Sequence, residues 1–140
     1  MGIEQSLERY HRAGAEFSRR HPGSVKDLVS GGDDVTLATP LGPPIGGWSA
    51  VSEAPDFAAS RFRDGAVTAF EPVATYATTD LVTVLEIEHW TVKVGGREEA
   101  ASFELRVTST FRRKAHERKL VDRHTDPIAT PDAEGLGGAN

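Results

Sequence analysis

One long β-hairpin, predicted for residues 81–111, constrains the fold of this chain most. β-Branched and aromatic residues dominate 81–94 and again 97–111, a composition that is typical of strands. Gly95 and Gly96 stand between the two runs and accommodate the positive φ angles of a two-residue hairpin turn. We therefore expect the other elements of the chain to be arranged around this hairpin.

The turn determines which residues of the hairpin share a face. A turn made of the two glycines alone would pair Trp90 with Ala101 and Glu86 with Leu105. One face is then an apolar wall with two acids in it, made of Val82, Val84, Glu86, Glu88, Trp90, Ala101, Phe103, Leu105 and Val107. Such a wall suggests a pocket without naming a reaction. A single β-bulge would reverse the faces and turn Arg106 and Thr108 toward the pocket instead.

Composition limits the class of protein. A chain of 140 residues corresponds to one domain, long enough to bury a core without disulfides or metals. The net charge of −5 gives no electrostatic reason to bind nucleic acid or a membrane, and the basic residues of 112–123 are interpreted as a solvated hairpin end. The absence of cysteine excludes thiol catalysis and thiolate metal sites. No apolar run approaches the ~18 residues that span a bilayer, and no signal peptide is visible, so a cytoplasmic location is expected.

Helical patterns precede the hairpin. Apolar residues at steps of three and four predict an amphipathic helix over 3–20, and a brief second helix is expected over 24–29. A short strand is predicted over 33–38 and a turn-rich loop over 39–47. A third helix over 48–62 should be kinked or divided by Pro55.

The remaining segments are strands and a tail. After a turn at Asp64-Gly65, a strand is predicted over 66–77, where Pro72 implies a bulge or an edge position. The last strand is predicted over 119–126, and residues 128–140 are expected to form a flexible tail. Helices followed by strands predict an α+β fold for residues 1–127, with a curved antiparallel sheet wrapped around N-terminal helices and enclosing a pocket.

This order of elements, together with two motifs, resembles the nuclear transport factor 2-like (NTF2-like) superfamily, which includes ketosteroid isomerase and the SnoaL-like polyketide cyclases. The first motif is Asp33-Asp-Val-Thr-Leu-Ala-Thr-Pro-Leu-Gly42 followed by Gly46-Gly47-Trp48. The second is Arg106-Val-Thr108 followed by Lys119-Leu-Val-Asp-Arg-His124-Thr-Asp126. The resemblance covers residues 3–127. It implies a cone-shaped α+β barrel, a deep pocket under the helices and a homodimer through the outer face of the sheet.

Two positions depart from the family's pattern. The aspartate that abstracts a proton in ketosteroid isomerase precedes Pro-x-Gly, and here that residue is Thr39, which cannot act as a general base near neutral pH. The first histidine of the final strand is replaced by Asp122, while the second is retained as His124. The tyrosine that donates to the oxyanion in the isomerase has its counterpart in Tyr10.

The departures place the chemistry on the acidic wall. Glu86 and Glu88 are two residues apart on a strand and point to the same face. Burial among apolar residues, with a like charge nearby, would raise the pKa of such a carboxyl group toward that of a general acid or base. We expect Glu86 to be this group, with Tyr10 or His124 donating to a developing oxyanion. The alternative is that both glutamates are solvated or paired and that His124 is structural.

The predicted function is cofactor-independent acid–base chemistry on a small hydrophobic molecule: isomerisation, cyclisation, dehydration or hydrolysis. Residues expected to line the pocket, or equally to form the core, are Phe17, Trp48, Phe57, Phe62, Glu88, Trp90, Phe103 and Leu105. No metal site is expected, because Asp122, His124 and Asp126 share only an alternating spacing. A non-catalytic binding or oligomerisation module, or a re-engineered pocket scaffold, is the alternative on the same fold.

Overall fold

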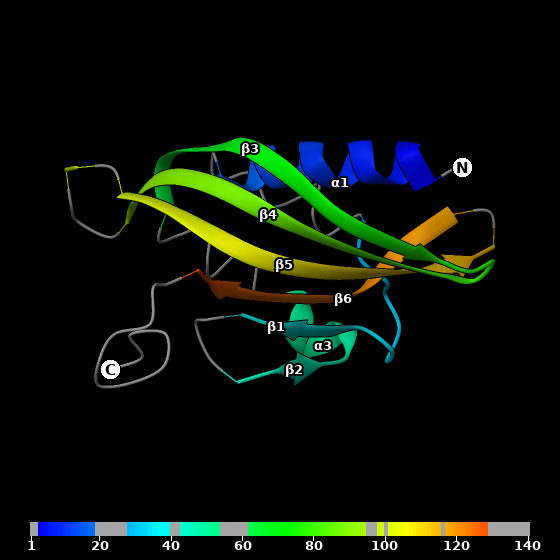
Figure 1. Ribbon diagram of the computed structural model, residues 1–140. Helices are drawn as coiled ribbons and strands as arrows, with labels where there is room; N and C mark the ends of the chain where they lie inside the picture. Colours follow the sequence, from blue (N-terminus) through cyan, green and yellow to red (C-terminus); the bar gives the residue numbers. More distant parts are fainter. Residues whose placement is uncertain are drawn as a thin grey trace, which may run out of the picture.

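The structure, a computed structural model, describes residues 3–18, 28–39, 43–53, 62–94, 98–99, 101–115 and 117–128. Its elements are α1 (Ile3–Ser18), β1 (Thr36–Ala38), β2 (Ile45–Gly46), α3 (Trp48–Val51), β3 (Phe62–Ala77), β4 (Leu81–Val94), β5 (Ala101–Lys114) and β6 (Glu117–Pro127). The strands form one sheet in the order β2-β1-β6-β5-β4-β3, and α1 lies over one face of its long strands (Figure 1). The predicted α+β fold is thus confirmed. Most of the second predicted helix, 24–29, falls outside the described residues.

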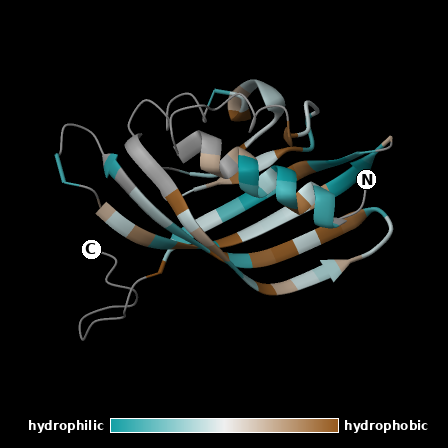
Figure 2. Cartoon of the chain, turned by 90° about the horizontal axis from the view of Figure 1, so that it is seen from above, coloured by the Kyte–Doolittle hydropathy of each residue, from teal (hydrophilic) through white to brown (hydrophobic). Residues whose placement is uncertain are grey.

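The sheet is mixed rather than purely antiparallel. Strands β3 to β6 pair antiparallel in chain order, whereas β1 pairs parallel with β6, so that Thr36 lies opposite Asp122. The two-residue strand β2 lies in the segment 39–47 that was expected to be a loop, and it pairs antiparallel with β1. The sheet stays open, with β2 and β3 at its edges, and its long strands curve so that the concave face looks toward α1 (Figure 2).

Two boundaries near the start of β3 differ from the sequence prediction. The helix α3 ends at Val51, and Phe62 begins a strand instead of closing that helix. Asp64-Gly65 lies inside β3, where the register with β4 shifts between Arg63 and Ala66. An Asp-Gly pair is as well suited to the extra residue of a bulge as to a turn, which explains the error.

Pro72 lies where its sequence context predicted. Strand β3 is an edge strand, and its register with β4 shifts between Pro72 and Ala74. Proline has no N–H to donate to a neighbouring strand, so both an edge position and a bulge tolerate it. Both expectations for this residue are therefore confirmed.

The register of the long hairpin differs from the predicted one by two residues. Trp90 lies opposite Phe103, and Glu86 lies opposite Val107 instead of Leu105. This register is incompatible with a turn made of two glycines alone. Because the side chains of a strand alternate with a period of two, a shift of two residues leaves every side chain on its predicted face. The acidic wall therefore faces α1, and Arg106 is exposed on the outer face.

The core lies between α1 and this wall. Its buried cluster consists of Tyr10, Ala13, Leu28, Val82, Val84, Phe111 and Leu120. The ring of Tyr10 meets that of Phe111 edge to face, with the ring centroids 5.3 Å apart. This packing fixes the height of α1 above the sheet and so brings the polar residues of its inner side close to the wall.

The predicted C-terminal tail and the predicted absence of a membrane-spanning helix remain to be compared with the structure. Of the predicted tail, 128–140, only Ile128 is among the described residues, and its backbone N–H donates to the Glu104 carbonyl at 3.0 Å. Within the described part of the chain, no helix has both the length and the apolar character needed to cross a membrane.

Candidate active site

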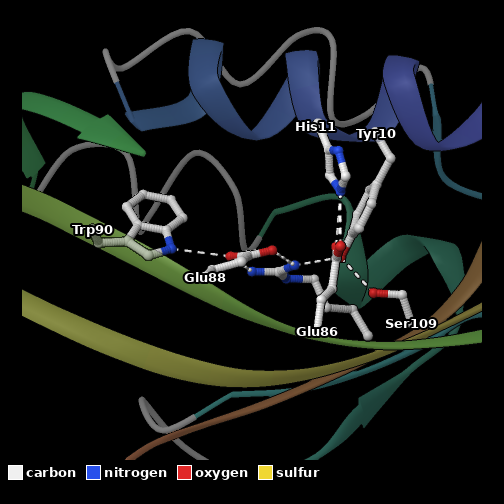
Figure 3. A network of polar contacts seen from close by, with 7 residues as sticks. Tyr10, His11, Glu86, Glu88, Trp90 and Ser109 are labelled. Atoms are coloured by element: carbon white, nitrogen blue, oxygen red, sulfur yellow. Dashed lines mark hydrogen bonds and ion pairs between the residues drawn. The ribbon is translucent and has the colours of Figure 1, made fainter. Parts of the chain in front are cut away.

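Two buried glutamates stand on the concave face of β4. Glu86 and Glu88 are each only 2% exposed, and on this face of the strand they lie between the apolar wall residues Val84 and Trp90. A buried carboxylate is costly unless it is paired and hydrogen-bonded. Each glutamate has a different set of partners (Figure 3), and the difference determines what each can do.

Glu88 is held by Arg123 of β6. The two terminal nitrogens of Arg123 each donate to one carboxylate oxygen at 2.9 Å, and Trp90 Nε1 donates to Oε1 at 3.0 Å. Burial acts to raise the pKa of Glu88, but the charge of Arg123 and these hydrogen bonds outweigh it and leave the pKa below its ordinary value. Glu88 is therefore an ionised, fixed carboxylate. The prediction that a carboxyl group in this wall has a raised pKa is therefore wrong for Glu88.

Tyr10 enters the same network from α1. Its hydroxyl lies 2.5 Å from Ser109 Oγ and accepts a short hydrogen bond from Arg123. Burial raises the pKa of Tyr10 to about 12 against the opposing charge of Arg123, so the phenol is neutral. The hydroxyl is engaged inside the protein by both neighbours. Its predicted role as an oxyanion donor stays a prediction.

The pKa of Tyr10 makes stability depend on pH at the alkaline end. The unfolded chain loses this proton near pH 10.0, whereas the folded protein holds it to about pH 12. The free energy of unfolding is expected to fall as the pH rises through this interval, and this part of the fall should be absent from Tyr10→Phe. Urea unfolding of both proteins at pH 9 to 11 measures the difference. Parallel pH profiles of the two proteins would contradict the assignment.

Glu86 contacts His11, a residue that the sequence did not single out. The Nε2 atom of His11 lies 2.9 and 3.0 Å from the two carboxylate oxygens of Glu86. The imidazole stacks on Phe70 of β3, with ring centroids 3.9 Å apart and an interplanar angle of 15°. The side chain of His11 is 29% exposed, and that of Glu86 is 3% exposed. A buried carboxylate therefore orients a histidine that solvent can reach.

One signal for His11 was present in the sequence. His11 follows Leu7 by four residues, which places it on the same side of the helix as the apolar stripe. A titratable residue beside an apolar stripe, above a wall that contains acids, is a candidate for a paired site.

His124 lies on the opposite face of the sheet from Glu86. It is exposed and stands between Thr108 of β5 and Ala38 of β1. Asp122 and Asp126 share this outer face, where Asp122 accepts a hydrogen bond from Thr36 and Asp126 pairs with Arg106. The prediction that His124 donates beside Glu86 is wrong, because the sheet separates the two residues.

A bulge in β6 accounts for this reversal. Thr110 pairs with Asp122, but the next residue, Phe111, pairs with Leu120, so that Val121 is the extra residue. Without it, Asp122 and His124 would point toward α1. With it, Arg123 takes the inward position opposite Ser109 and reaches Glu88.

The predicted lining residues fall into three groups. Trp90 is buried and stacks on the half-buried Phe103, with ring centroids 6.1 Å apart. Leu105, opposite Glu88, and Trp48, in α3, are also half-buried. Phe57 and the side chains of Phe17 and Phe62 fall outside the description.

Among the described residues, no group of three or more His, Asp or Glu side chains could hold a metal ion.

Comparison with known proteins gives a fold and no closer relationship. No protein-family model and no curated protein matches the chain. An NTF2-like superfamily protein from Salmonella enterica matches with a TM-score of 0.77 at 16% identity, over 94% of this chain and 92% of its own. A ketosteroid isomerase-like protein from Erwinia carotovora atroseptica gives 0.75 at 18% identity, over 91% and 95%.

A third solved structure points the same way. It is an NTF2-like family protein from Streptomyces avermitilis, provisionally assigned as a dehydratase, with a TM-score of 0.69 at 16% identity over 91% of this chain and 94% of its own. At such identities the likeness establishes the fold alone. The chain has the NTF2-like fold, in agreement with the resemblance seen in its sequence.

Proposed function

We propose that this protein is an enzyme that performs cofactor-independent acid–base chemistry on a small hydrophobic molecule bound against His11, between α1 and the sheet. The observation that carries the proposal is the contact of this partly exposed histidine with the buried Glu86. Isomerisation, cyclisation, dehydration and hydrolysis are the candidate reactions. Two structural neighbours are described as ketosteroid isomerase-like and, provisionally, as a dehydratase, and both names denote chemistry of this kind.

The contact assigns a role to each ring nitrogen of His11. When Nε2 carries the ring proton and donates a hydrogen bond to Glu86, Nδ1 has a free lone pair, and no described residue makes a hydrogen bond to it. A neutral imidazole held in this way accepts a proton at Nδ1, and the ionised Glu86 stabilises the imidazolium that forms. Glu86 thus acts through His11, because its own side chain is only 3% exposed.

The second buried pair has a supporting role in this proposal. Arg123 neutralises Glu88 and also holds the hydroxyl of Tyr10, the residue that precedes His11 on α1. Together these contacts fix the helix over the wall at the point where His11 meets Glu86. The ring of Phe70, which stacks on the imidazole of His11, restricts rotation of the imidazole.

Solvent exchange tests the proposal without knowledge of the natural substrate. Wild-type protein in D2O is expected to accelerate deuterium exchange at the α-carbon of a neutral ketone such as 2-tetralone, followed by proton NMR. Glu86→Gln should reduce the accelerated rate by at least about tenfold, because the imidazolium loses its counter-charge. Glu104→Gln, which removes a carboxylate from the outer face, is the matched control and should leave the rate unchanged. An equal rate in wild type and Glu86→Gln would refute the role of the pair.

We further propose that the outer face of the sheet pairs with a second copy of the chain. Tyr76 is 65% exposed on β3 and Leu81 40% exposed on β4, and Leu85 and Ile87, farther along the same face of β4, are half-buried. On the same face Arg106 pairs with Asp126. Exposed apolar side chains gathered on one face are typical of a protein–protein interaction site.

The mass in solution tests this second proposal. Light scattering should give twice the chain mass of 15.1 kDa, and Tyr76→Asp should lower the mass to that of a monomer. Thr79→Asp, an exposed position in the β3–β4 turn, is the control for added charge. A wild-type protein that is monomeric at high concentration would contradict the proposal.

A further inference from the structure

The charges around His11 restrict the class of ligand that can bind there. We propose that the site takes an uncharged or cationic ligand and discriminates against carboxylates and phosphates. The inference rests on the proposed function for the position of the site but concerns binding, which is measured without turnover.

The charged groups in contact around His11 and Tyr10 are unequal in number. They are two buried carboxylates, those of Glu86 and Glu88, and one guanidinium, that of Arg123, whose side chain is 20% exposed. With His11 neutral the group therefore has a net charge of −1, and with His11 protonated it has none. In neither state does the group carry a surplus positive charge for an anionic ligand.

Arg123 is also unavailable as an anion-binding residue. Its two terminal nitrogens are occupied by the oxygens of Glu88, and one of them also donates to Tyr10. A ligand carboxylate could reach this guanidinium only by displacing Glu88, which would leave a buried carboxylate without a partner. The geometry that stabilises Glu88 thus removes the guanidinium of Arg123 from competition.

The cations of α1 do not offset the negative charge of Glu86 at the position of a ligand. Arg9 lies 3.5 Å from Glu117, with its side chain 33% exposed, and Arg12 is exposed to solvent. Exposed charges are screened by water, whereas the buried Glu86 acts on a ligand at His11 through a medium of lower polarity. The nearer, buried negative charge therefore dominates at this position.

Uncharged ligands also fit the proposed proton transfer. When His11 takes a proton from such a ligand, an imidazolium and an oxyanion form together, and the total charge of the site does not change. A ligand that is already anionic would add a second uncompensated negative charge beside Glu86. The same carboxylate that stabilises the imidazolium thereby selects the ligand.

Three matched probes test this selectivity. 2-Naphthylmethanol, 2-naphthylmethylammonium and 2-naphthoate are titrated at pH 7.5 into 15N-labelled protein, and dissociation constants are taken from amide shifts of α1 and β4. The alcohol and the ammonium ion are expected to bind, and naphthoate should bind at least about tenfold more weakly than the alcohol. Glu86→Gln should reduce this ratio severalfold, whereas Glu104→Gln, which removes a charge from the outer face, should leave it unchanged.

The outcomes separate this inference from the proposed function. Naphthoate that binds as tightly as the alcohol to wild type overturns the inference, even if Glu86→Gln does not fold. Failure of all three probes to bind also overturns it, as does a ratio that Glu86→Gln and Glu104→Gln change equally. A protein that shows the selectivity but does not accelerate α-carbon exchange would retain the binding inference and lose the catalytic proposal.

Discussion

His11→Gln is expected to lower kcat/KM for the α-carbon exchange by about 10²- to 10⁴-fold, the usual contribution of a general base. Glutamine is close to histidine in length and can still donate a hydrogen bond to Glu86, but it cannot accept a proton at the position of Nδ1. The buried carboxylate thus keeps a partner, and the loss reports on chemistry rather than on folding. Rates are measured by proton NMR, together with unfolding curves for each variant.

His89→Gln is the matched control for this experiment. His89 lies on β4, the strand of Glu86, and contacts two carboxylates, those of Glu71 and Glu104, each at 3.1 Å, on the outer face. Its replacement should leave the exchange rate within about twofold, since no group of the concave site is touched. If His11→Gln keeps near-wild-type activity, or if both variants lose the same activity, His11 is not the base.

The faces of the long hairpin were predictable, and its register was not. Alternation along a strand has a period of two, so any even shift preserves the side on which Glu86 and Glu88 lie. The register itself depends on the length of the connection between Val94 and Ala101, and Gly95-Gly96 gave a misleadingly short turn. Glu86 and Glu88 lie on their predicted face, although their predicted partners on β5 were wrong, because the error in register was an even number of residues.

The polar partners of the wall could not be predicted in the same way. One extra residue in β6, Val121, exchanges the inward and outward positions that follow it. It turns Arg123 toward Glu88 and His124 toward solvent, the reverse of the arrangement that a regular strand would give. Nothing local marks that bulge in the segment 119–126, since it arises from pairing with β5. The contact of His11 with Glu86 likewise joins residues that are distant in sequence and meet only when α1 packs on the sheet.

Arg123→Met is expected to destabilise the protein by about 3–5 kcal/mol, the usual cost of removing one partner of a buried ion pair. Glu88, whose side chain is 3% exposed, would lose its counter-charge, and the hydroxyl of Tyr10 would lose a donor. Arg106→Met is the control: Arg106 pairs with Asp126 on the outer face, and both side chains are largely exposed, at 60% and 47%. An exposed pair of this kind contributes about 1 kcal/mol or less. Urea unfolding at pH 7 gives both values.

The pH dependence and a double variant establish that the unpaired carboxylate causes the loss. In wild type the depressed pKa of Glu88 contributes stability that is present above the ordinary glutamate pKa and is lost as the pH falls through the folded-state value. Without Arg123, the effect of burial, which raises the pKa of Glu88, is no longer opposed by the guanidinium and is offset only in part by the hydrogen bond from Trp90. Arg123→Met should therefore be closest to wild type in acid and fall behind as the pH rises. Combining it with Glu88→Leu should recover most of the loss, because a buried ion pair can be replaced by apolar residues at little cost. If the double variant is as unstable as Arg123→Met alone, Arg123 stabilises the fold by packing, and its pairing with Glu88 is not what holds α1 over the wall.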